Sequence, residues 1–485
     1  MNQRPLAELL AALRQEELLL TAPPATVSVG GVTADSRSVA RGDVYVAVRG
    51  SQSDGHRFIP DAIQRGAVAV VGEQATGAVV PEIIVTEGRR AAIVLGRWWH
   101  NDPGRQLTLV GITGTNGKTT TTALVRHLLN AHGTAGSIGT LGAFDGTGNP
   151  VPSTAGSLTT PGPIDLQATL AALVRRGVTH VAMETSSHSL DQGRLEGVRF
   201  AAGVFTNLTR DHLDYHGTME RYLAAKLMLD GLLDARGVQV VNLDDPAWAA
   251  LPHSHRRLTF GFGSGADVRP AELQQGSAGS SFRLDTPAGP TQVSLPLLGE
   301  FNVANALAAA ACGLALGTPL QQIGERLTAA PQVPGRMERI AEHPTIVLRD
   351  YAHTPDALER ALAALRPLTA GRLIVVFGCG GDRDRGKRPV MGRIAATLAD
   401  VAIVTSDNPR TENPDAIIAD VEQGMGQVQH ERHVDRRAAI AAALQLAVVG
   451  DTVLLAGKGH ETYQVIGTEK VPFDEREIVR ALGAT

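Results

Sequence analysis

Residues 107–126 read LTLVGITGTNGKTTTTALVR, and this stretch decides how the rest of the chain is interpreted. Its first part, 107–112, is a short apolar run of the kind that forms a buried strand. A glycine-bounded turn follows at 114–117, and Lys118 then opens a segment with helical character. A strand, a tight glycine loop and a helix N-terminus together cradle phosphate, because backbone N–H groups and the helix dipole face the anion. The stretch therefore predicts an ATP site.

The loop departs from the strict phosphate-loop pattern in its spacing. Two residues separate its glycines where the strict pattern has four, and Ile112 stands where that pattern begins with glycine. The strand before the loop and the helix after it outweigh the alternative, a glycine turn followed by a surface lysine. We expect Lys118 to reach the β- and γ-phosphates and Thr119 or Thr120 to offer a hydroxyl to Mg²⁺. The candidate nucleotide contacts of the loop are Gly114, Thr115, Asn116, Gly117, Lys118, Thr119 and Thr120.

Length and composition restrict the class of protein. At 485 residues the chain is too long for one core, and its length suggests about three domains. The 45 basic and 49 acidic residues nearly balance, so no nucleic-acid partner is expected. The two cysteines, Cys312 and Cys379, suit a reducing compartment. Arg14, Glu16 and Glu17 interrupt the N-terminal apolar pattern, which indicates an amphipathic helix and no signal peptide. Without an apolar run long enough to span a bilayer, we expect a cytoplasmic protein.

Strand and helix patterns alternate along the whole chain and predict an α/β fold with mostly parallel sheets. The expected strands are the apolar runs 44–48, 67–71, 107–112, 178–183, 202–206, 238–243, 346–348, 373–377, 401–405 and 452–455. We expect a small α/β domain at 1–100, a central phosphate-loop domain at 101–333 with helices on both faces of its sheet, and a Rossmann-like domain at 334–485. The last domain lacks a Gly-x-Gly-x-x-Gly string after its first strand, so a dinucleotide cofactor is not expected.

Polar residues gather where the expected strands of the central domain end. Glu184 follows the strand at 178–183, and His212 lies in the loop after the strand at 202–206. Because the carboxyl ends of parallel strands meet at one edge of a sheet, this carboxylate and this imidazole can share a Mg²⁺ with a phosphate-loop threonine. In isolation, Glu184 fits a helix cap and His212 a surface loop. Beside a phosphate loop, the pair indicates a metal site.

Lys226 is the least ordinary residue of the central domain. It lies in an expected helix at 218–233, and helical spacing places it on one face with apolar neighbours. These neighbours are Met219, Tyr222, Leu223, Leu229 and Leu233. A half-buried lysine has a lowered pKa, and its neutral amine can add CO₂ to form a carbamate. The alternative is a lysine that extends its charge into solvent.

The last domain has four polar loops after its expected strands, at 350–353, 380–387, 407–410 and 457–461. One loop alone would be an ordinary charged rim, but four loops at one sheet edge can converge on one ligand. Their arginines and carboxylates suit a zwitterion, because an amine needs acceptors and a carboxylate needs a planar fork. An amino-acid site is therefore expected here.

In this order the chain carries strings that resemble those of the Mur ligase family: TGTNGKTT, METSSH, DHLDYH, AAK, GRME, DYAHTP, GGDRDRGKRP, DNPR and GKGHE. The resemblance covers essentially the whole chain. It implies that ATP converts a carboxylate to an acyl phosphate and that an amine then displaces the phosphate. DNPR resembles the signature of family members that add meso-diaminopimelate. The implied reaction joins this amino acid to the D-Glu γ-carboxylate of UDP-N-acetylmuramoyl-L-Ala-D-Glu, in the synthesis of peptidoglycan precursors.

The resemblance also implies roles for individual residues. The catalytic residues would be Lys118, Glu184, His212 and Lys226. Two Mg²⁺ would be held by Thr119, Glu184, His212 and Lys226 as its carbamate. Further ATP contacts would be Asn305, Arg336 and Asp350. The contacts to the UDP-muramoyl peptide would be Ser36, Ser51, Gln52, Ser53, Thr159, Thr160, Ser186, Gln192 and Arg194. The diaminopimelate contacts would be Arg383, Asp407, Asn408, Pro409, Arg410, Gly457 and Glu461.

Several alternatives remain open at this point. The acceptor amine can be L-lysine or L-ornithine if neighbouring residues reshape the pocket around DNPR. A folylpolyglutamate synthetase shares the phosphate loop and the ligation chemistry, and a nucleotide switch or motor protein shares the loop alone. A non-catalytic paralogue should have lost Lys118, Glu184, His212 or Lys226, and all four are present. We expect a monomer that acts on small molecules.

Overall fold

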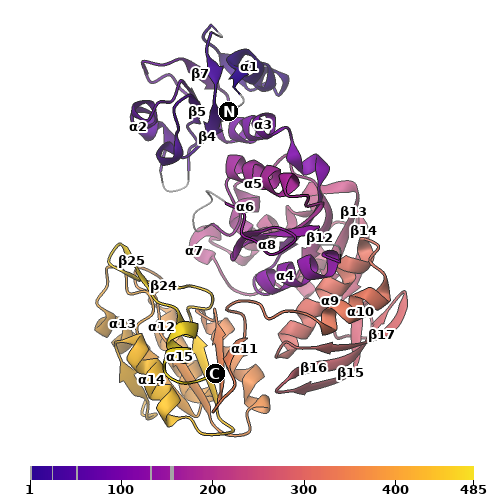
Figure 1. Ribbon diagram of the computed structural model, residues 1–485, viewed down its shortest axis with the longest axis vertical. Coiled ribbons are helices and arrows are strands. Elements are labelled where there is room, and N and C mark those ends of the chain that lie inside the picture. The colour runs from indigo at the N-terminus through magenta and orange to yellow at the C-terminus, as the bar shows by residue number, and fades with distance from the viewer. Residues whose placement is uncertain (1–2, 25, 51–52, 132–133, 153–157) are drawn as a thin grey trace. The chain divides into compact units, whose positions relative to one another are not determined.

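The computed structural model describes residues 3–24, 26–50, 53–131, 134–152 and 158–485. The described chain divides into two compact units. The first holds Met1–Asp267 with Ala308–Pro319, and the second holds Val268–Leu307 with Leu320–Thr485. Both are built from helices and sheets, as Figure 1 shows, which confirms the expected α/β class.

The first unit begins with a sheet whose described strands have the order β2-β7-β6-β5-β4. β2 is antiparallel to its neighbour and the other strands are parallel. The strands are β2 (Leu19–Thr21), β4 (Gly31–Thr33), β5 (Asp43–Val46), β6 (Ala69–Gly72) and β7 (Glu82–Val85), and a separate pair is formed by β1 (Arg4–Pro5) and β3 (Ser28–Val29). The helices are α1 (Leu6–Gln15), α2 (Ile59–Gln64) and α3 (Gly88–His100). α1 forms as its amphipathic pattern predicts, because its leucines Leu6, Leu9, Leu10 and Leu13 recur at helical spacing and are all buried.

The same unit contains a larger sheet, with the described strand order β10-β9-β11-β8-β12-β13-β14. All neighbours in it are parallel except β10, which is antiparallel at one edge. The strands are β8 (Thr108–Thr113), β9 (Ala135–Gly139), β10 (Gly142–Phe144), β11 (His180–Glu184), β12 (Phe200–Phe205), β13 (Leu233–Asn242) and β14 (Arg256–Phe260). The helices are α4 (Lys118–Leu129), α5 (Pro163–Arg175), α6 (Ser187–Asp191), α7 (Leu213–His216) and α8 (Met219–Leu227).

Helices cover both faces of this sheet. The buried leucines of α5 pack against Leu109, Val181 and Met183 on one face, and α4 lies on the opposite side of the strands in Figure 1. Since β8 lies between β11 and β12, the loops after these three strands are neighbours at the carboxyl edge of the sheet. The expected mostly parallel central sheet is confirmed.

The second unit combines a small antiparallel sheet with a larger, mostly parallel one. The small sheet contains β15 (Arg269–Gly276), β16 (Gly279–Thr286) and β17 (Gly289–Leu295), followed by α9 (Glu300–Ala315) and α10 (Leu320–Thr328). α9 runs across the division between the two units. The larger sheet has the described order β18-β19-β23-β20-β21-β22, and only β18 at its edge is antiparallel.

The elements of this larger sheet alternate along the chain, as expected for a Rossmann-like layout. Its strands are β18 (Glu338–Ala341), β19 (Ile346–Asp350), β20 (Leu373–Phe377), β21 (Val401–Thr405), β22 (Glu431–His433) and β23 (Thr452–Ala456). The helices are α11 (Pro355–Leu365), α12 (Lys387–Leu398), α13 (Pro414–Glu422), α14 (Arg436–Leu446) and α15 (Glu475–Ala481), and a hairpin is formed by β24 (Tyr463–Ile466) and β25 (Glu469–Pro472).

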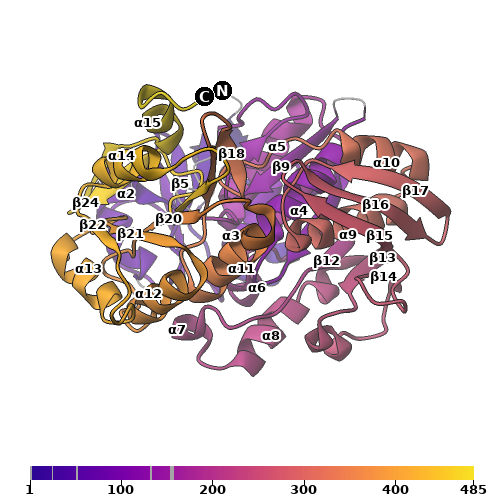
Figure 2. The same ribbon diagram turned by 90° about the horizontal axis from the view of Figure 1, so that it is seen from below.

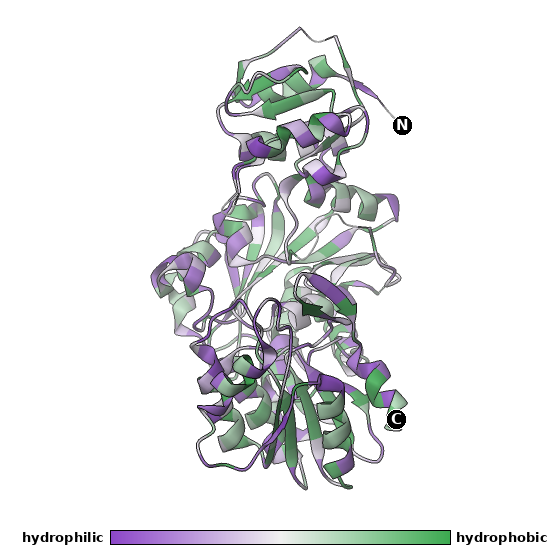
Figure 3. Ribbon diagram, turned by 90° about the vertical axis from the view of Figure 1, so that its left-hand side faces the viewer, coloured by the Kyte–Doolittle hydropathy of each residue, from purple (hydrophilic) through white to green (hydrophobic). Residues whose placement is uncertain are grey.

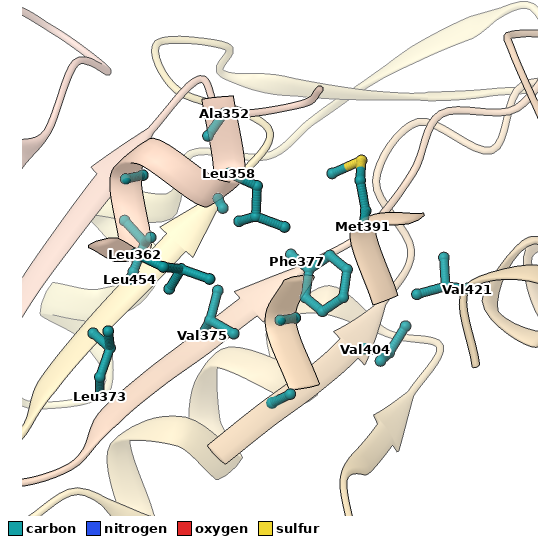
Figure 4. Packing of buried hydrophobic residues seen from close by; sticks show 14 of the residues in the cluster. Ala352, Leu358, Leu362, Leu373, Val375, Phe377, Met391, Val404, Val421 and Leu454 are labelled. Carbon is teal, nitrogen blue, oxygen red and sulfur yellow. The ribbon is translucent and has the colours of Figure 1, made fainter. Parts of the chain in front are cut away.

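Strand β20 shows why this part of the chain forms a buried parallel strand. Its residues are apolar without alternation, because both of its faces are covered. Val375 and Phe377 point into the cluster beneath α11, α12 and α13 shown in Figure 4, whereas Ile374 and Val376 pack under α14 and α15. Figure 2 shows these two sets of helices on opposite sides of the sheet, and in Figure 3 the strands are mainly green.

One expected helix is shorter than the sequence pattern indicates. α8 ends at Leu227, a 3₁₀ turn follows at Asp230–Leu232, and Leu233 already begins strand β13. The single helix expected at 218–233 is therefore wrong in its second half. The apolar spacing continues past the end of α8 because Leu229 and Leu233 are buried in the same core. An apolar pattern alone does not distinguish such buried residues from a continuing helix.

Candidate active site

The phosphate loop follows β8 and leads into α4. Gly114 has φ +145°, and a Cβ on it would lie 1.9 Å from Oγ1 of Thr206, so this position requires glycine. Gly117, with φ +84°, is the N-cap of α4. The N–H groups of the first helical turn therefore lie next to the loop, as an anion site requires.

The loop after β12 braces the phosphate loop by hydrogen bonds. The Asn207 side chain accepts from the backbone N of Asn116 at 2.9 Å and donates to its carbonyl oxygen at 3.1 Å. The hydroxyl of Thr115 accepts from the backbone N of Thr209 at 2.9 Å. Asn207 and Thr209 were not singled out from the sequence. In the sequence, the only feature that points to them is their position after the expected strand at 202–206, whose carboxyl end was expected at the same sheet edge as the phosphate loop.

Two lysines meet at the carbonyl oxygen of Gly114. Lys118 Nζ donates to it at 3.0 Å and to the carbonyl oxygen of Thr115 at 2.8 Å, and Lys226 Nζ donates to it at 2.7 Å. The Lys226 side chain is only 1% exposed, more buried than expected, and its Nζ lies 4.4 Å from the centroid of the Tyr222 ring. Burial, and then the charge of Lys118, hold the pKa of Lys226 well below its usual range.

Glu184 is the last residue of β11 and is also 1% exposed. Its carboxylate accepts hydrogen bonds from the backbone N of Thr140 at 2.9 Å and from the hydroxyl of the same residue at 3.0 Å. A Cβ on Gly139 would lie 2.3 Å from this carboxylate, so the glycine makes room for it. No basic side chain pairs with Glu184 among the described residues. A buried carboxylate held only by neutral donors is a site prepared for a cation.

His212 opens α7 with a left-handed backbone, φ +52°. Its side chain is 45% exposed, with Nε2 3.4 Å from Oδ2 of Asp211. Its ring meets the ring of His188 edge-on, with 4.8 Å between the centroids. Partial burial lowers the pKa of His212, and burial beside two histidines lowers the pKa of His188 to about 4. Both imidazoles are therefore neutral at pH 7, the form in which a histidine binds a metal.

The chemical types of these donor groups suit Mg²⁺. Glu184 offers carboxylate oxygens, His212 a neutral imidazole, and Thr119, in the first turn of α4, a hydroxyl. Among the described residues there is no group of three or more His, Cys, Asp or Glu side chains placed to share one metal ion. Mg²⁺ in this place would depend on phosphate and water oxygens as well, as it commonly does.

The residues expected to bind the muramoyl peptide form one hydrogen-bonded network. The Thr160 hydroxyl donates to the carbonyl oxygen of Glu184 at 2.8 Å and accepts from the backbone N of Ser186 at 3.2 Å. Arg194 donates to the Gln192 side chain at 2.9 Å and to the carbonyl oxygen of Thr160 at 3.2 Å. Thr159 joins the group through a 3.3 Å contact between its hydroxyl and that of Thr140.

Arg89 of α3 links this network to the N-terminal sheet, and sequence reasoning did not single it out. It donates to the carbonyl oxygens of Arg49 and Gln192, both at 3.0 Å. Burial, and then the charge of Arg89, lower the pKa of Arg194. Two guanidinium groups therefore lie near each other beside the peptide loops, which favours an anionic ligand.

Two of the expected uridine contacts lie on loops after the neighbouring parallel strands β4 and β5. Ser36 is buried in a 3₁₀ turn after β4, and Ser53 accepts through its carbonyl oxygen from Gly50 N at 2.9 Å in the loop after β5. The other two, Ser51 and Gln52, lie outside the described residues.

The remaining expected ATP contacts lie in the second unit. Asn305 of α9 is buried and donates to the side chain of Asn302 at 3.2 Å. The guanidinium of Arg336 lies 4.8 Å from the centroid of the Tyr351 ring. Asp350, the last residue of β19, accepts from the backbone N of Met337 at 2.7 Å, and burial raises its pKa.

The four polar loops of the second unit follow β19, β23, β20 and β21, which are adjacent strands of one sheet, as expected. Arg410 donates to the carbonyl oxygen of Gly381 at 2.8 Å. A Cβ on Gly381 would lie 1.9 Å from the carbonyl oxygen of Pro409, so only glycine allows these two loops to meet. Arg383 is exposed in the same loop.

A buried lysine lies beneath the loops after β21 and β23. Lys458, fully buried, donates to Asn408 Oδ1 at 2.9 Å and to Glu461 Oε2 at 3.1 Å, and its Nζ lies 3.5 Å from Asp407 Oδ1. Asn408 also donates to Glu461 Oε2 at 3.0 Å. The structure thus brings together Asp407, Asn408 and Glu461, as expected. It adds Lys458, whose sequence signal was its place inside the GKGHE string.

A parallel sheet with an anion-type loop at its carboxyl edge is the arrangement typical of nucleotide-binding α/β proteins, and this chain has that arrangement. Three family models match it in order: "Mur ligase family, catalytic domain" over residues 28–94, "Mur ligase middle domain" over 112–313, and "Mur ligase, glutamate ligase domain" over 335–459. The chain therefore belongs to the Mur ligase family.

Several proteins that are similar to this chain share the same name. The UDP-N-acetylmuramoyl-L-alanyl-D-glutamate–2,6-diaminopimelate ligase of Gloeobacter violaceus is 45% identical over 97% of this chain and 98% of its own length. The ligase of that name from Geobacillus kaustophilus is 44% identical over 92% of this chain and 93% of its own length. A solved structure of a ligase of that name has a TM-score of 0.67 and 34% identity, covering 99% of each chain.

A more distant structure shows a shared fold only. The Mycobacterium tuberculosis folylpolyglutamate synthase complexed with ADP and AMPPCP is 19% identical, with a TM-score of 0.63, over 76% of this chain and 92% of its own. For the chain itself, no helix within the described residues is both long and apolar enough to cross a membrane.

Proposed function

We propose that this chain is an ATP-dependent acid–amino-acid ligase of peptidoglycan precursor synthesis. It joins meso-diaminopimelate to the D-Glu γ-carboxylate of UDP-N-acetylmuramoyl-L-Ala-D-Glu and releases ADP and phosphate. The observation that carries this proposal is the 45% identity over 97% of the chain to a relative with that name. The folylpolyglutamate synthase alternative has weaker support, because its similarity extends to the fold alone.

Phosphoryl transfer needs positive charge beside the transferred oxygens, which Lys118 supplies and which a Mg²⁺ held by the buried Glu184 carboxylate would add to. The substrate's γ-carboxylate attacks the γ-phosphorus of ATP, and ADP leaves. Lys118 follows the loop glycines and stabilises the negative charge on the transferred phosphoryl oxygens. Residues 114–120 bind the phosphates, and Asn305, Arg336 and Asp350 complete the ATP contacts. When bound, Mg²⁺ neutralises the phosphate oxygens and favours attack by the carboxylate.

We assign two Mg²⁺ to Thr119, Glu184, His212 and Lys226. The absence of a basic partner for buried Glu184 among the residues that the structure describes supports the first, and the depressed pKa of Lys226 supports the second. A neutral amine adds CO₂ with loss of a proton, which converts the Lys226 amine into a carbamate anion. The hydrogen bond from its Nζ to Gly114 places this side chain at the phosphate loop.

Each substrate has its own set of assigned residues. Ser36, Ser51, Gln52 and Ser53 contact the uridine nucleotide. Thr159, Thr160, Ser186, Gln192 and Arg194 contact the muramoyl peptide. Arg383, Asp407, Asn408, Pro409, Arg410, Gly457 and Glu461 bind the diamino acid, with Arg410 on its distal carboxylate. The neutral amine of the bound amino acid attacks the acyl carbon, and phosphate leaves.

Assignments of location, oligomeric state, domain bounds and cellular role complete the proposal. We assign the activity to the cytoplasm, to a monomer, and to three domains at 1–100, 101–333 and 334–485. Through cell-wall synthesis, the enzyme supports cell shape and cell division. The order of the three matched family models supports the three-domain assignment.

The test offers meso-diaminopimelate, L-lysine and L-ornithine separately, each with ATP, Mg²⁺ and the UDP-muramoyl dipeptide. ADP release and product mass are measured. Strong preference for diaminopimelate is expected. Turnover with lysine or ornithine alone would retain the ligase and reject the acceptor assignment, whereas no turnover with any amine would reject the ligase.

A further inference from the structure

We propose that Lys458 is the positioning residue of the acceptor amino-acid site and holds Asn408 and Glu461 in the arrangement that binds the acceptor. The inference rests on the proposed function and concerns a side chain that the function does not use directly. Lys458 is fully buried, so its effect passes through the groups it contacts. It is the second residue after β23, which ends at Ala456, and it contacts Asn408 of the loop after β21.

The orientation of the Asn408 amide is determined by the donors around it. Its Oδ1 accepts from Lys458 Nζ and from the backbone N of Val465, both at 2.9 Å. Because both neighbours are donors, the oxygen must face them, and the amide NH₂ must point away toward Glu461. The NH₂ group donates to Glu461 Oε2 at 3.0 Å. Lys458 and the backbone of Val465 therefore determine together how the amide is presented.

The Glu461 carboxylate is oriented by the same lysine. Its Oε2 accepts from Lys458 at 3.1 Å and from Asn408 at 3.0 Å. Its Oε1 accepts no hydrogen bond from the residues that the structure describes. One carboxylate oxygen is thus committed to the protein, and the other is left for an ammonium ligand.

Charge balance gives the lysine a second role. Asp407 and Glu461 carry two negative charges, and Lys458, 3.5 Å and 3.1 Å from them, supplies one positive charge. The cluster has a net charge of −1 and suits one ammonium group, while Arg410 in the neighbouring loop suits a carboxylate. Without Lys458 the two carboxylates repel each other, and their positions in the empty site change.

The hairpin β24–β25 secures the same loop from its other side. Gln464 donates to the carbonyl oxygen of Asp407 at 2.8 Å, Arg410 N donates to the carbonyl oxygen of Val465 at 3.0 Å, and Gly467 N donates to that of Arg410 at 2.8 Å. The hairpin therefore holds the DNPR backbone and one lone pair of Asn408 Oδ1, whereas Lys458 is the group that joins the Asn408 and Glu461 side chains to each other. Removing the lysine should disturb the ligand groups and leave the loop in place.

The test compares Lys458→Met, which keeps the length and removes the charge, with Lys458→Arg, which keeps the charge. Lys470→Met, at an exposed lysine of β25, is the matched control. Each protein is assayed for kcat and for KM of ATP, UDP-muramoyl dipeptide and diaminopimelate. Acyl phosphate formation is measured separately by trapping with hydroxylamine, whose nitrogen attacks the acyl carbon as phosphate leaves, without the acceptor amino acid.

We expect Lys458→Met to raise KM for diaminopimelate by about 100-fold, since charge-assisted hydrogen bonds within the acceptor site are lost. Hydroxamate yield and KM for ATP should stay within about twofold of wild type, and Lys458→Arg should recover part of the lost affinity. A folded Lys458→Met protein with a wild-type KM for diaminopimelate would overturn the inference.

If hydroxamate formation is also lost, the methionine variant is misfolded. The comparison with wild type is then repeated with Lys458→Gln, whose neutral side chain still donates a hydrogen bond. The KM for diaminopimelate again decides the outcome. Wild-type protein that forms neither hydroxamate nor product from the UDP-muramoyl dipeptide would reject the proposed function itself. The failure of the inference and the failure of the function are therefore distinguishable.

Discussion

The side chains of Lys118 and Lys226 donate to the same atom, the carbonyl oxygen of Gly114, at 3.0 Å and 2.7 Å. Two ammonium groups on one acceptor would repel each other, so the charge of Lys118 adds to burial in lowering the pKa of Lys226 and favours its neutral amine. An arriving phosphate relieves this repulsion for Lys118, whereas conversion to a carbamate relieves it for Lys226. The pair thus explains physically why one lysine suits phosphate binding and the other suits modification.

The role of Lys226 can be tested by substitution and by control of CO₂. Lys226→Met should lower kcat by about 100-fold or more, because a charged group at the reacting phosphate is lost. Wild-type enzyme in CO₂-depleted buffer should lose activity and recover it with bicarbonate, as measured by ADP release. Lys470→Met is the control. Near-normal turnover of Lys226→Met would contradict the metal assignment.

Gly114→Ala tests the geometry of the phosphate loop. The new Cβ would collide with Thr206, and φ +145° is unfavourable for alanine. The loop should shift, and kcat/KM for ATP should fall by about 100-fold, since a misplacement of about 1 Å is enough for this loss. Gly231→Ala, where a Cβ meets open space, should behave as wild type. An unchanged ATP dependence in Gly114→Ala would refute the tight-loop interpretation.

Glu412→Gln tests the support beneath the acceptor loops. Fully buried Arg388 donates to both oxygens of Glu412, at 2.8 Å and 3.0 Å, and to Asp420 at 2.8 Å. The hydrogen bonds from Arg388 and the backbone hold the pKa of Glu412 at about 2, below its usual 4.5. The variant leaves a buried guanidinium partly uncompensated, which should lower the free energy of unfolding at pH 7 by about 3 kcal/mol.

The loss of unfolding free energy in Glu412→Gln should depend on pH in a definite direction. A depressed carboxyl pKa contributes stability that is fully present above pH 4.5 and is lost as pH falls through about 2. The difference between wild type and Glu412→Gln should therefore narrow between pH 4.5 and 2. Urea unfolding at several pH values checks this, with Glu469→Gln on exposed β25 as control. A difference that is constant across this range would contradict the assigned pKa.

Arg410→Ala tests which group recognises the acceptor. Loss of the guanidinium should raise KM for meso-diaminopimelate by about 100-fold, because a charge-assisted contact to the distal carboxylate is removed. L-lysine lacks that carboxylate, so its turnover should change little. Competition between the two amino acids, read by product mass, measures the change in preference. Arg480→Ala, an exposed arginine paired with Glu477, is the control, and equal losses with both amino acids would reject the assignment.

Local sequence patterns predicted much of the fold correctly but failed at the end of one helix. β20 and β21 have the predicted bounds, and α11 begins at a local signal, the Thr354 hydroxyl cap followed by Pro355. These features depend on neighbouring residues and on uninterrupted apolar runs. The end of α8 could not be read in this way, since its leucines remain buried after the helix stops and the pattern continues unchanged.

By itself, the sequence determined the phosphate loop, the α/β class, and which loops carry the polar residues, because glycine turns, buried strands and helix caps are encoded over a few residues. Only the tertiary structure decided which of those residues meet. The full burial of Lys226 against Gly114, the bracing of the phosphate loop by Asn207, and the place of Lys458 between Asn408 and Glu461 join segments distant in sequence. Such contacts depend on strand order, and strand order follows from the packing of the whole sheet rather than from any one stretch.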